Sequence, residues 1–203
     1  MRVPNRQVFI NCPFDESYYP FIEAATFTIL ACGYSPRCAL EFVDTGYDRL
    51  SRIVDLIDQC DFSLHDISLT ELDPDSGLPR FNMPFELGIA WGRKPRKTDR
   101  KLLVMDRALH RYERSISDLK ALDPVSHGGD PLEMVAQVRN WLSSHQTIPL
   151  NGPNHMKDWH QRFQMALPEI CSESGFERSR VAKTFKDLVY CAVLWLNAKV
   201  PAA

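Results

Sequence analysis

The chain has 203 residues, of which 44% are hydrophobic and 25% are charged, a composition typical of globular proteins. This composition excludes a disordered, collagen-like or coiled-coil protein. The 24 Lys and Arg residues nearly balance the 26 Asp and Glu residues, so the formal net charge is −2 and nucleic acid is not an expected partner. A nucleoside or nucleotide ligand remains compatible with this charge, because it requires only a local site.

The sequence contains no segment that is long and apolar enough to cross a membrane. The most apolar stretch, 21–32, has about a dozen residues and includes Glu23, whereas a membrane helix needs about 20. No apolar signal-peptide core precedes the first predicted strand. The spacing of the six cysteines suits neither a zinc site nor a compact disulfide framework, and four of them lie in apolar runs typical of core positions. We therefore expect a cytoplasmic protein without a bound metal.

Strand-like and helix-like segments alternate through the first two-thirds of the chain. Residues 7–14 form a short apolar run that predicts a buried strand. Residues 19–32 predict a helix that ends at Gly33. A second strand is expected at 37–43. The clearest helix is 47–60, where apolar residues recur at i, i+3, i+4 and i+7.

The alternation continues beyond this helix. Residues 61–67 predict a third strand, and a polar loop at 70–80 follows it. Pro84 is expected to open a helix at 85–92, because proline suits the first turn of a helix. The apolar run at 101–105 predicts a fourth strand.

The last part of the chain is predicted to be mainly helical. Residues 107–121 are expected to be partly helical, and the Asp-Pro pair at 130–131 is typical of a helix start. Residues 149–154 resemble a linker. Two further helices are expected at 159–171 and 182–198.

Repeated strand–helix units of this length predict an α/β fold with a doubly wound, mostly parallel sheet that helices cover on both faces. We place this α/β domain at 1–148 and a C-terminal helical extension at 149–203. In open parallel sheets, ligands bind at the carboxyl ends of the strands. Polar residues that follow the predicted strands are therefore the first candidates for a functional site.

Several polar residues occupy such positions. Asn11 and Asp15 follow the first strand, where they either cap the next helix or hold the hydroxyl groups of a ribose. Arg37 belongs to the second strand and either pairs with Glu41 or reaches a phosphate. Asp66 ends the third strand, either as a turn residue or as a carboxylate that accepts hydrogen bonds from a sugar or a base.

Three further features surround these candidates. His65 is expected to be structural, because neighbouring strand residues point to opposite faces of a sheet. Asn82 lies just before the helix predicted at 85–92. The basic run at 93–101 contains six Lys and Arg residues; it is either a solvated loop or a segment that captures phosphate or contacts nucleic acid.

Glu86 is the most informative candidate. It lies two residues after Pro84, which places it in the first turn of its predicted helix, with Gly88 close behind. A carboxylate in the first turn can simply complement the helix dipole, which contributes roughly 0.3–1 kcal/mol. It can also face a cleft, where the dipole would keep it ionised to attack an anomeric carbon or to stabilise an oxocarbenium-like transition state. Spacing alone leaves both interpretations open.

Three common motifs are absent from the sequence. Without G-x-x-x-x-G-K-[ST], a P-loop NTPase is excluded. Residues 11–14 (NCPF) occupy the place of a G-x-G-x-x-G loop, so a dinucleotide-binding fold of that type is not expected. The nucleophile elbow G-x-S-x-G is also missing.

Two segments carry a resemblance to known families. Val8 to Asp15 (VFINCPFD) is similar to the opening strand and loop of nucleoside 2-deoxyribosyltransferase-like proteins and of TIR domains, which share a flavodoxin-like fold. Asn82 to Gly92 (NMPFELGIAWG) resembles the helix motif of the deoxyribosyltransferases. Together with PRCALE and HDIS, these segments also resemble a bacterial branch of this superfamily, and related domains act as effectors in anti-phage defence. The resemblance covers roughly residues 7 to 145.

The resemblance implies roles for individual residues. Glu86 corresponds to the glutamate that forms a glycosyl-enzyme intermediate, and Asp66 is similar to a strand-end aspartate that binds substrate. Asn11 and Asp15 would then orient the ribose, and the remaining expected substrate-binding residues are Arg37 and Asn82. The chain departs from true deoxyribosyltransferases in its N-C-P-F-D loop, where a glycine-rich loop is expected, and in its helical extension.

The implied function is hydrolysis or transfer at the N-glycosidic bond of a nucleoside, a nucleotide or NAD, with NAD as a substrate and no cofactor. One alternative is a sensor that binds a nucleotide without cleaving it. Another is a TIR-like module that self-associates through the apolar helix at 182–198, although the plainer expectation is that this helix packs on its own domain. The expected partners are a small nucleoside or nucleotide and further copies of the chain in a homo-oligomer.

Overall fold

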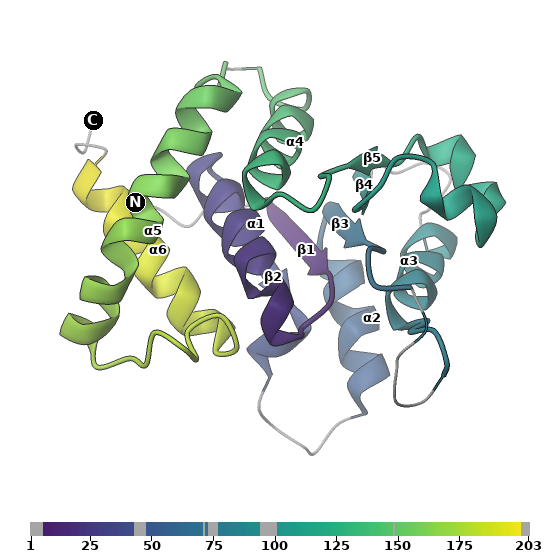
Figure 1. The fold of residues 1–203 in the computed structure, drawn as a ribbon, viewed down its shortest axis with the longest axis horizontal. Helices are drawn as coiled ribbons and strands as arrows, with labels where there is room; N and C mark the ends of the chain where they lie inside the picture. The colour runs from purple at the N-terminus through teal and green to yellow at the C-terminus, as the bar shows by residue number, and fades with distance from the viewer. Residues whose placement is uncertain are drawn as a thin grey trace.

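A parallel β-sheet forms the centre of the molecule (Figure 1). The computed structural model describes residues 6–42, 48–70, 72, 77–93, 101–147 and 149–199. In these ranges the sheet has five strands in the order β2-β1-β3-β4-β5, and each neighbouring pair is parallel. The strands are β1 (Gln7–Asn11), β2 (Ser35–Cys38), β3 (Phe62–Asp66), β4 (Lys101–Asp106) and β5 (Val125–Ser126). This doubly wound, flavodoxin-like order confirms the predicted α/β fold class.

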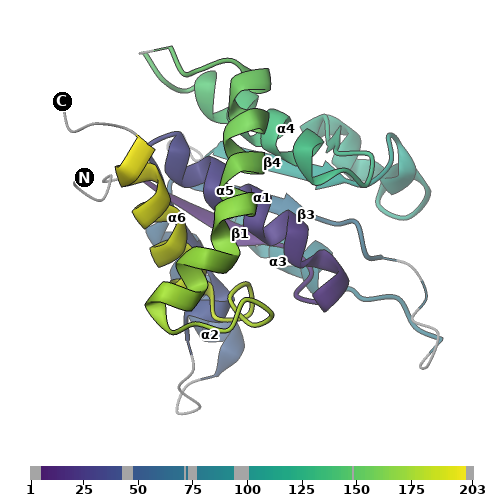
Figure 2. The same cartoon turned by 60° about the vertical axis from the view of Figure 1, so that its left-hand side comes forward.

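Helices cover both faces of the sheet (Figures 1 and 2). On one face, Val8 and Ile10 of β1 pack in the same core as α1 (Tyr19–Ala31) and α4 (Pro131–Ser143). On the other face, Phe9 packs with residues of α2 (Arg49–Gln59) and α3 (Asn82–Gly92). Because successive strand residues point to opposite faces, burial of both faces explains the continuous apolar run in this part of the sequence.

Several predicted boundaries in the first half differ from the structure. The first strand ends at Asn11 rather than at 14, and the second begins at Ser35 rather than at 37. The second strand ends at Cys38 and a short 3₁₀ helix, η2 (Ala39–Glu41), follows, because the Glu41 carboxylate accepts a hydrogen bond from the Cys38 N–H (2.8 Å) and closes a capping box. The third helix begins at Asn82 rather than after Pro84. The predicted strand end and helix start at 43–47 lie outside the described residues, as do 94–100 of the basic run.

In the second half of the chain, α4 begins at the Asp-Pro pair, as the sequence pattern predicts. Asp130 caps this helix by accepting a hydrogen bond from the Leu132 N–H (2.9 Å), and Pro131 occupies its first position. The segment predicted to be partly helical contains two 3₁₀ helices, η3 (Arg111–Arg114) and η4 (Ser117–Leu122).

The C-terminal helices α5 (Pro153–Ser174) and α6 (Phe185–Lys199) pack against α1, and α5 also contacts α4 (Figure 2). The Phe27 ring of α1 stacks on Phe163 of α5, with 5.0 Å between ring centroids, and meets Trp195 of α6 edge-on at 5.6 Å. One hydrophobic core therefore extends from the sheet into the helical extension. The apolar face of α6 packs in this core, which confirms the expectation that the helix packs on its own chain.

All six cysteines are buried free thiols, which confirms the core positions predicted for four of them. No helix within the described ranges has the length and apolar character that a bilayer span requires.

A partly buried ion pair ties the helical extension to the α/β part. Glu23 of α1 is 3% exposed, and its carboxylate accepts hydrogen bonds from both terminal nitrogens of Arg178 (2.6 and 3.0 Å). Gln164 of α5 donates to the same carboxylate (2.8 Å). Because Arg178 lies in the loop before α6, this pair fixes the position of that loop on α1.

We expect Arg178→Ala to lower the free energy of unfolding by about 2 kcal/mol, because it leaves the Glu23 carboxylate buried without its charged partner. Urea unfolding followed by circular dichroism measures this loss. The matched control is Arg162→Ala, since Arg162 and its partner Asp158 are both largely exposed and such pairs contribute little. An equal loss in the two variants would contradict the prediction.

Candidate functional site

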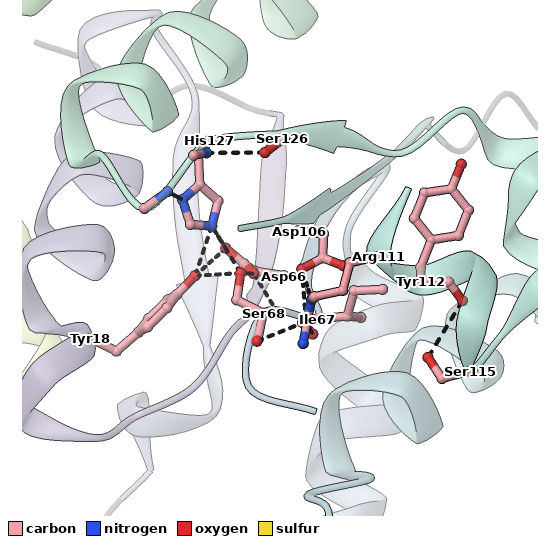
Figure 3. Close-up of polar contacts among 12 residues, drawn as sticks. Tyr18, Asp66, Ile67, Ser68, Asp106, Arg111, Tyr112, Ser115, Ser126 and His127 are labelled. Carbon is pink, nitrogen blue, oxygen red and sulfur yellow. Dashed lines mark hydrogen bonds and ion pairs between the residues drawn. The ribbon is translucent and has the colours of Figure 1, made fainter. Parts of the chain in front are cut away.

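Two polar groups occupy the carboxyl edge of the sheet. The first is a buried hydrogen-bond network formed by Tyr18, Asp66, Ser68 and His127, whose exposed fractions lie between 0 and 4% (Figure 3). The Tyr18 hydroxyl and the Ser68 hydroxyl each donate to the Asp66 carboxylate, and the Ser68 backbone N–H donates to the same group (2.9 Å). His127 Nε2 lies 2.9 Å from Ser68 Oγ and 3.2 Å from Asp66 Oδ2.

The hydrogen bonds of His127 decide what this network can do. The Gly129 N–H donates to His127 Nδ1 (3.2 Å), so in the neutral ring Nε2 carries the hydrogen and directs it at Asp66 and Ser68. A Ser–His–Asp triad needs the opposite arrangement, in which Nε2 accepts from the serine and Nδ1–H donates to the aspartate. The network therefore joins the loops after β3 and β5 to η1 (Glu16–Tyr18) and does not form a triad.

Arg111 links this hydrogen-bond network to β4 (Figure 3). Its guanidinium pairs with Asp106 (2.8 Å from Nε to Oδ1) and donates to the backbone carbonyls of Ile67 and Ser68, both at 2.8 Å. Both oxygens of Asp66 accept hydrogen bonds from the protein itself. Its predicted role in substrate binding stays a prediction.

Asn11 lies at the end of β1 and bonds toward α3. Its side-chain nitrogen donates to the Met83 carbonyl (3.0 Å) and to His65 Nδ1 (3.0 Å). Burial lowers the pKa of His65 to about 3, so the ring is neutral. His65 packs edge-on against Phe9 on the α2–α3 face, opposite Asp66, as the strand alternation predicts. The predicted contact between Asn11 and a ribose stays a prediction.

Two other predicted residues are engaged in ion pairs. Arg37 Nε contacts both oxygens of Glu41 (2.8 and 2.9 Å), and its Nη1 donates to Gln7 (2.6 Å). This confirms the pairing interpretation of Arg37, and its contact with a phosphate stays a prediction. Asp15 follows β1, and Arg80 Nη1 donates to both of its carboxylate oxygens (2.6 and 2.5 Å).

Glu86 differs from the sequence prediction in its place on the helix. Since α3 begins at Asn82, which is exposed, Glu86 is the fifth helical residue and its predicted position in the first turn is wrong. Pro84 is tolerated inside the first turn because the N–H groups there have no helical acceptor. The dipole argument for an ionised Glu86 therefore fails.

Burial sets the charge of Glu86 instead. The residue is 8% exposed, and this desolvation raises the pKa of its carboxyl to about 7, a rise that the positive charge of Arg49 partly offsets. Among the described residues the carboxyl has no hydrogen-bond partner. At neutral pH it therefore populates both protonation states, as a group that takes part in acid–base or nucleophilic chemistry must.

The Cys12 thiol lies within electrostatic range of both acidic groups. The negative charges of Asp66 and Glu86 add to the effect of burial and raise the pKa of Cys12 well above its usual value. Because the thiolate is the nucleophilic form of cysteine, Cys12 is unsuited to attack a substrate at neutral pH. Glu86 is therefore the better candidate for a nucleophile at this end of β1.

The second polar group surrounds a cavity of about 1120 Å³ at the carboxyl ends of β1 and β2. Its walls come from the loop after β1, from η2, from the first turns of α2 and from the loop before α6. Four lining side chains are cationic: Arg49, Arg52, Arg180 and Lys183. Asp15 also lines the cavity. Glu86 is not among the lining residues, but Arg49, which is, lies within electrostatic range of its carboxyl.

Sequence reasoning missed the cationic residues of this cavity, although a signal was present. Arg49 and Arg52 lie in the first turn of α2, and Lys183 lies just before α6. Cations are unfavourable at a helix N-terminus, so their presence there indicates an electrostatic role. Tyr18 and His127, by contrast, are 109 positions apart, and no local pattern connects them.

No protein-family model matches the sequence, and comparisons with curated proteins and with solved structures likewise give no match. Within the described part of the chain, no group of three or more His, Cys, Asp or Glu side chains is arranged to hold a metal ion.

Proposed function

We propose that the protein cleaves the N-glycosidic bond of a nucleoside or nucleotide, by hydrolysis or by transfer, with Glu86 acting on C1′ of the sugar. One observation carries this proposal: a buried carboxyl with a pKa of about 7 lies beside Arg49, which lines a cavity at the ligand-binding edge of an α/β sheet. The similarity of the Asn82 to Gly92 segment to the deoxyribosyltransferase motif supports the same role. NAD is one candidate substrate, and an effector role in bacterial defence is consistent with it.

The proposed reaction proceeds by two displacements at C1′. The ionised Glu86 carboxylate attacks C1′ as the bond to the base breaks, and the base departs with the bonding electrons. A purine or pyrimidine then takes up a proton, whereas the cationic nicotinamide of NAD⁺ departs neutral without one. Water, or a second base, then attacks C1′ and releases the carboxylate. Because the carboxylate is largely desolvated, it stabilises the positive charge that develops on the sugar more strongly than it would in water.

A base-release assay tests this function. The protein is incubated separately with NAD⁺, deoxynucleosides and nucleoside monophosphates, and free base is measured by liquid chromatography. Release of base that depends on Glu86 supports the proposal. Tight nucleotide binding in calorimetry without any product after long incubation would instead favour a sensor.

One observation favours that sensor as the second candidate. Residues of the helical extension and of the α/β part line the same cavity, so a bound ligand would contact both. A module that self-associates through α6 has no such support, because the apolar face of that helix is buried in the core of the same chain. The expected homo-oligomer stays a prediction.

The rate is expected to depend on pH through Glu86. Attack requires the ionised carboxylate, so kcat/KM should rise with pH along an acid limb centred near pH 7 and level off above it. Initial rates of base release over a pH series measure this profile. Because the charge of Arg49 lowers the pKa of Glu86, Arg49→Gln should move the limb to higher pH. A limb near the ordinary glutamate value of 4.5 would contradict the assignment.

A further inference from the structure

Two distant parts of the chain bring positive charge to the same cavity. Arg49 and Arg52 come from the first turn of α2, and Arg180 and Lys183 come from the loop before α6. That loop lies beside η2, which contacts α6 (Figures 1 and 2). The four cations outnumber the acidic residues among the described lining side chains.

Those acidic side chains are Asp15 and Glu16. The charge of Asp15 is neutralised by Arg80, which pairs with it at 2.5 Å. Arg180 pairs with Glu177 at 3.1 Å, but both side chains are largely exposed, so this pair is weak and an anion can replace it. Arg49, Arg180 and Lys183 therefore give the cavity an excess of positive charge, without counting Arg52, which interacts with other parts of the chain.

One helix N-terminus, that of α6, strengthens this excess. Thr184, which directly precedes α6, lines the cavity, whereas the N-terminus of α2 is capped by the Asp48 carboxylate, which accepts a hydrogen bond from the Ser51 N–H (3.0 Å). The backbone N–H groups of Asp187 and Leu188 donate to the Thr184 carbonyl (2.8 and 3.3 Å), so Thr184 closes the first turn of α6. The free N–H groups and the dipole of a helix N-terminus attract anions, and phosphate groups above all.

The loop that carries Arg180 and Lys183 is held in place. Val181 and Ala182, between the two cations, are 0 and 1% exposed, which anchors the loop in the core. The Arg178–Glu23 ion pair fixes the loop on α1 at a second point. The two cationic side chains are therefore presented to the cavity by a preorganised backbone, which lowers the entropic cost of binding.

From this convergence we propose that the first turn of α2 and the loop before α6 form a phosphate-binding subsite, so that the helical extension is a part of the ligand site. The cavity volume of about 1120 Å³ accommodates a nucleotide, since ligand sites usually measure roughly 300–1,000 Å³. That the phosphate belongs to a nucleotide rests on the proposed function. Phosphate binding itself rests on the cationic side chains around the cavity and on the N-terminus of α6.

Calorimetry tests the subsite with three probes: adenosine diphosphate, adenosine and inorganic pyrophosphate. The titrations use the Glu86→Gln chain, so that turnover does not consume the nucleotide. We expect the diphosphate to bind at least about tenfold more tightly than adenosine, and pyrophosphate to compete with it. Lys183→Ala and Arg180→Ala should each weaken binding of the diphosphate about tenfold and leave binding of adenosine unchanged.

The matched control is Lys186→Ala. Lys186 is exposed in the first turn of α6, three residues from Lys183, and does not line the cavity. Equal affinities for adenosine and its diphosphate, or equal losses in Lys183→Ala and Lys186→Ala, would overturn the subsite, and base release by the wild-type chain would still support the proposed function. Diphosphate binding that depends on Lys183, without base release from any nucleotide, would support the subsite and reject the glycosidic activity.

Discussion

Glu86→Gln is expected to lower kcat/KM for base release by at least about a hundredfold to a thousandfold, because the amide cannot attack C1′ and carries no negative charge to stabilise the sugar cation. Glutamine has nearly the same shape as glutamate, so nucleotide binding should persist. Binding that persists while turnover is lost would place the defect in the chemical step and not in the fold or the cavity.

Rates of base release by the wild-type chain and by Glu86→Gln measure this effect on whichever nucleotide the screen identifies. Glu173→Gln provides the control, because this carboxylate is exposed on α5 whereas that of Glu86 is buried. Glu86→Asp retains the charge but shortens the side chain by one methylene, so it should retain part of the activity. Turnover by Glu86→Gln at the wild-type rate would reject Glu86 as the nucleophile.

The same substitution should make the protein more stable at alkaline pH. Burial raises the pKa of Glu86 from 4.5 to about 7 in the folded chain, so between these values the folded state binds more protons than the unfolded state. The stability contributed by neutral Glu86 is complete below pH 4.5 and is lost as the pH rises through about 7. The loss amounts to about 3 kcal/mol, since one pKa unit corresponds to about 1.4 kcal/mol.

Glutamine is uncharged at every pH, so Glu86→Gln should lack this loss. Urea unfolding at a series of pH values should show similar stabilities for the two chains near pH 4.5 and an advantage of about 3 kcal/mol for Glu86→Gln above pH 8. Glu173→Gln should show no pH-dependent difference from the wild-type chain. A constant difference between Glu86→Gln and the wild-type chain across this range would contradict burial as the cause of the shifted pKa. The outcome expected here is a gain of stability together with a loss of activity, as in other proteins whose active sites hold a desolvated charge.

The sheet and its helices were predictable because they depend on local patterns. The apolar run of β1 and the Asp-Pro start of α4 encode their own structures, and both lie where the sequence places them. The sequence pattern predicts the start of α3 too late, because it takes proline as the opening of the helix, whereas any position in the first turn tolerates proline. Because α3 begins earlier, Glu86 lies beyond the first turn. Burial, which keeps its carboxyl partly neutral, replaces the helix dipole, which would have kept it ionised, as the explanation of its charge.

The candidate site was predictable only in part. Glu86 was found because its motif is local in sequence. The cavity joins the first turn of α2 to the loop before α6, more than a hundred residues away, and such a meeting depends on how the helical extension packs. The polar groups at the end of β3 were correctly placed at the carboxyl edge, but the sequence could not show that Tyr18 and His127 already satisfy Asp66.

The hydrophobic core that the sheet shares with α5 and α6 couples the unfolding of these two parts. Phe27 contacts Phe163 and Trp195 directly, so removal of α5 and α6 would expose an aromatic surface on α1 to water. The extension and the sheet should therefore melt together in one cooperative transition, as a single folding unit. A fragment that ends at the linker would lose its fold as well as one wall of its cavity, so function has to be measured on a chain that includes α5 and α6.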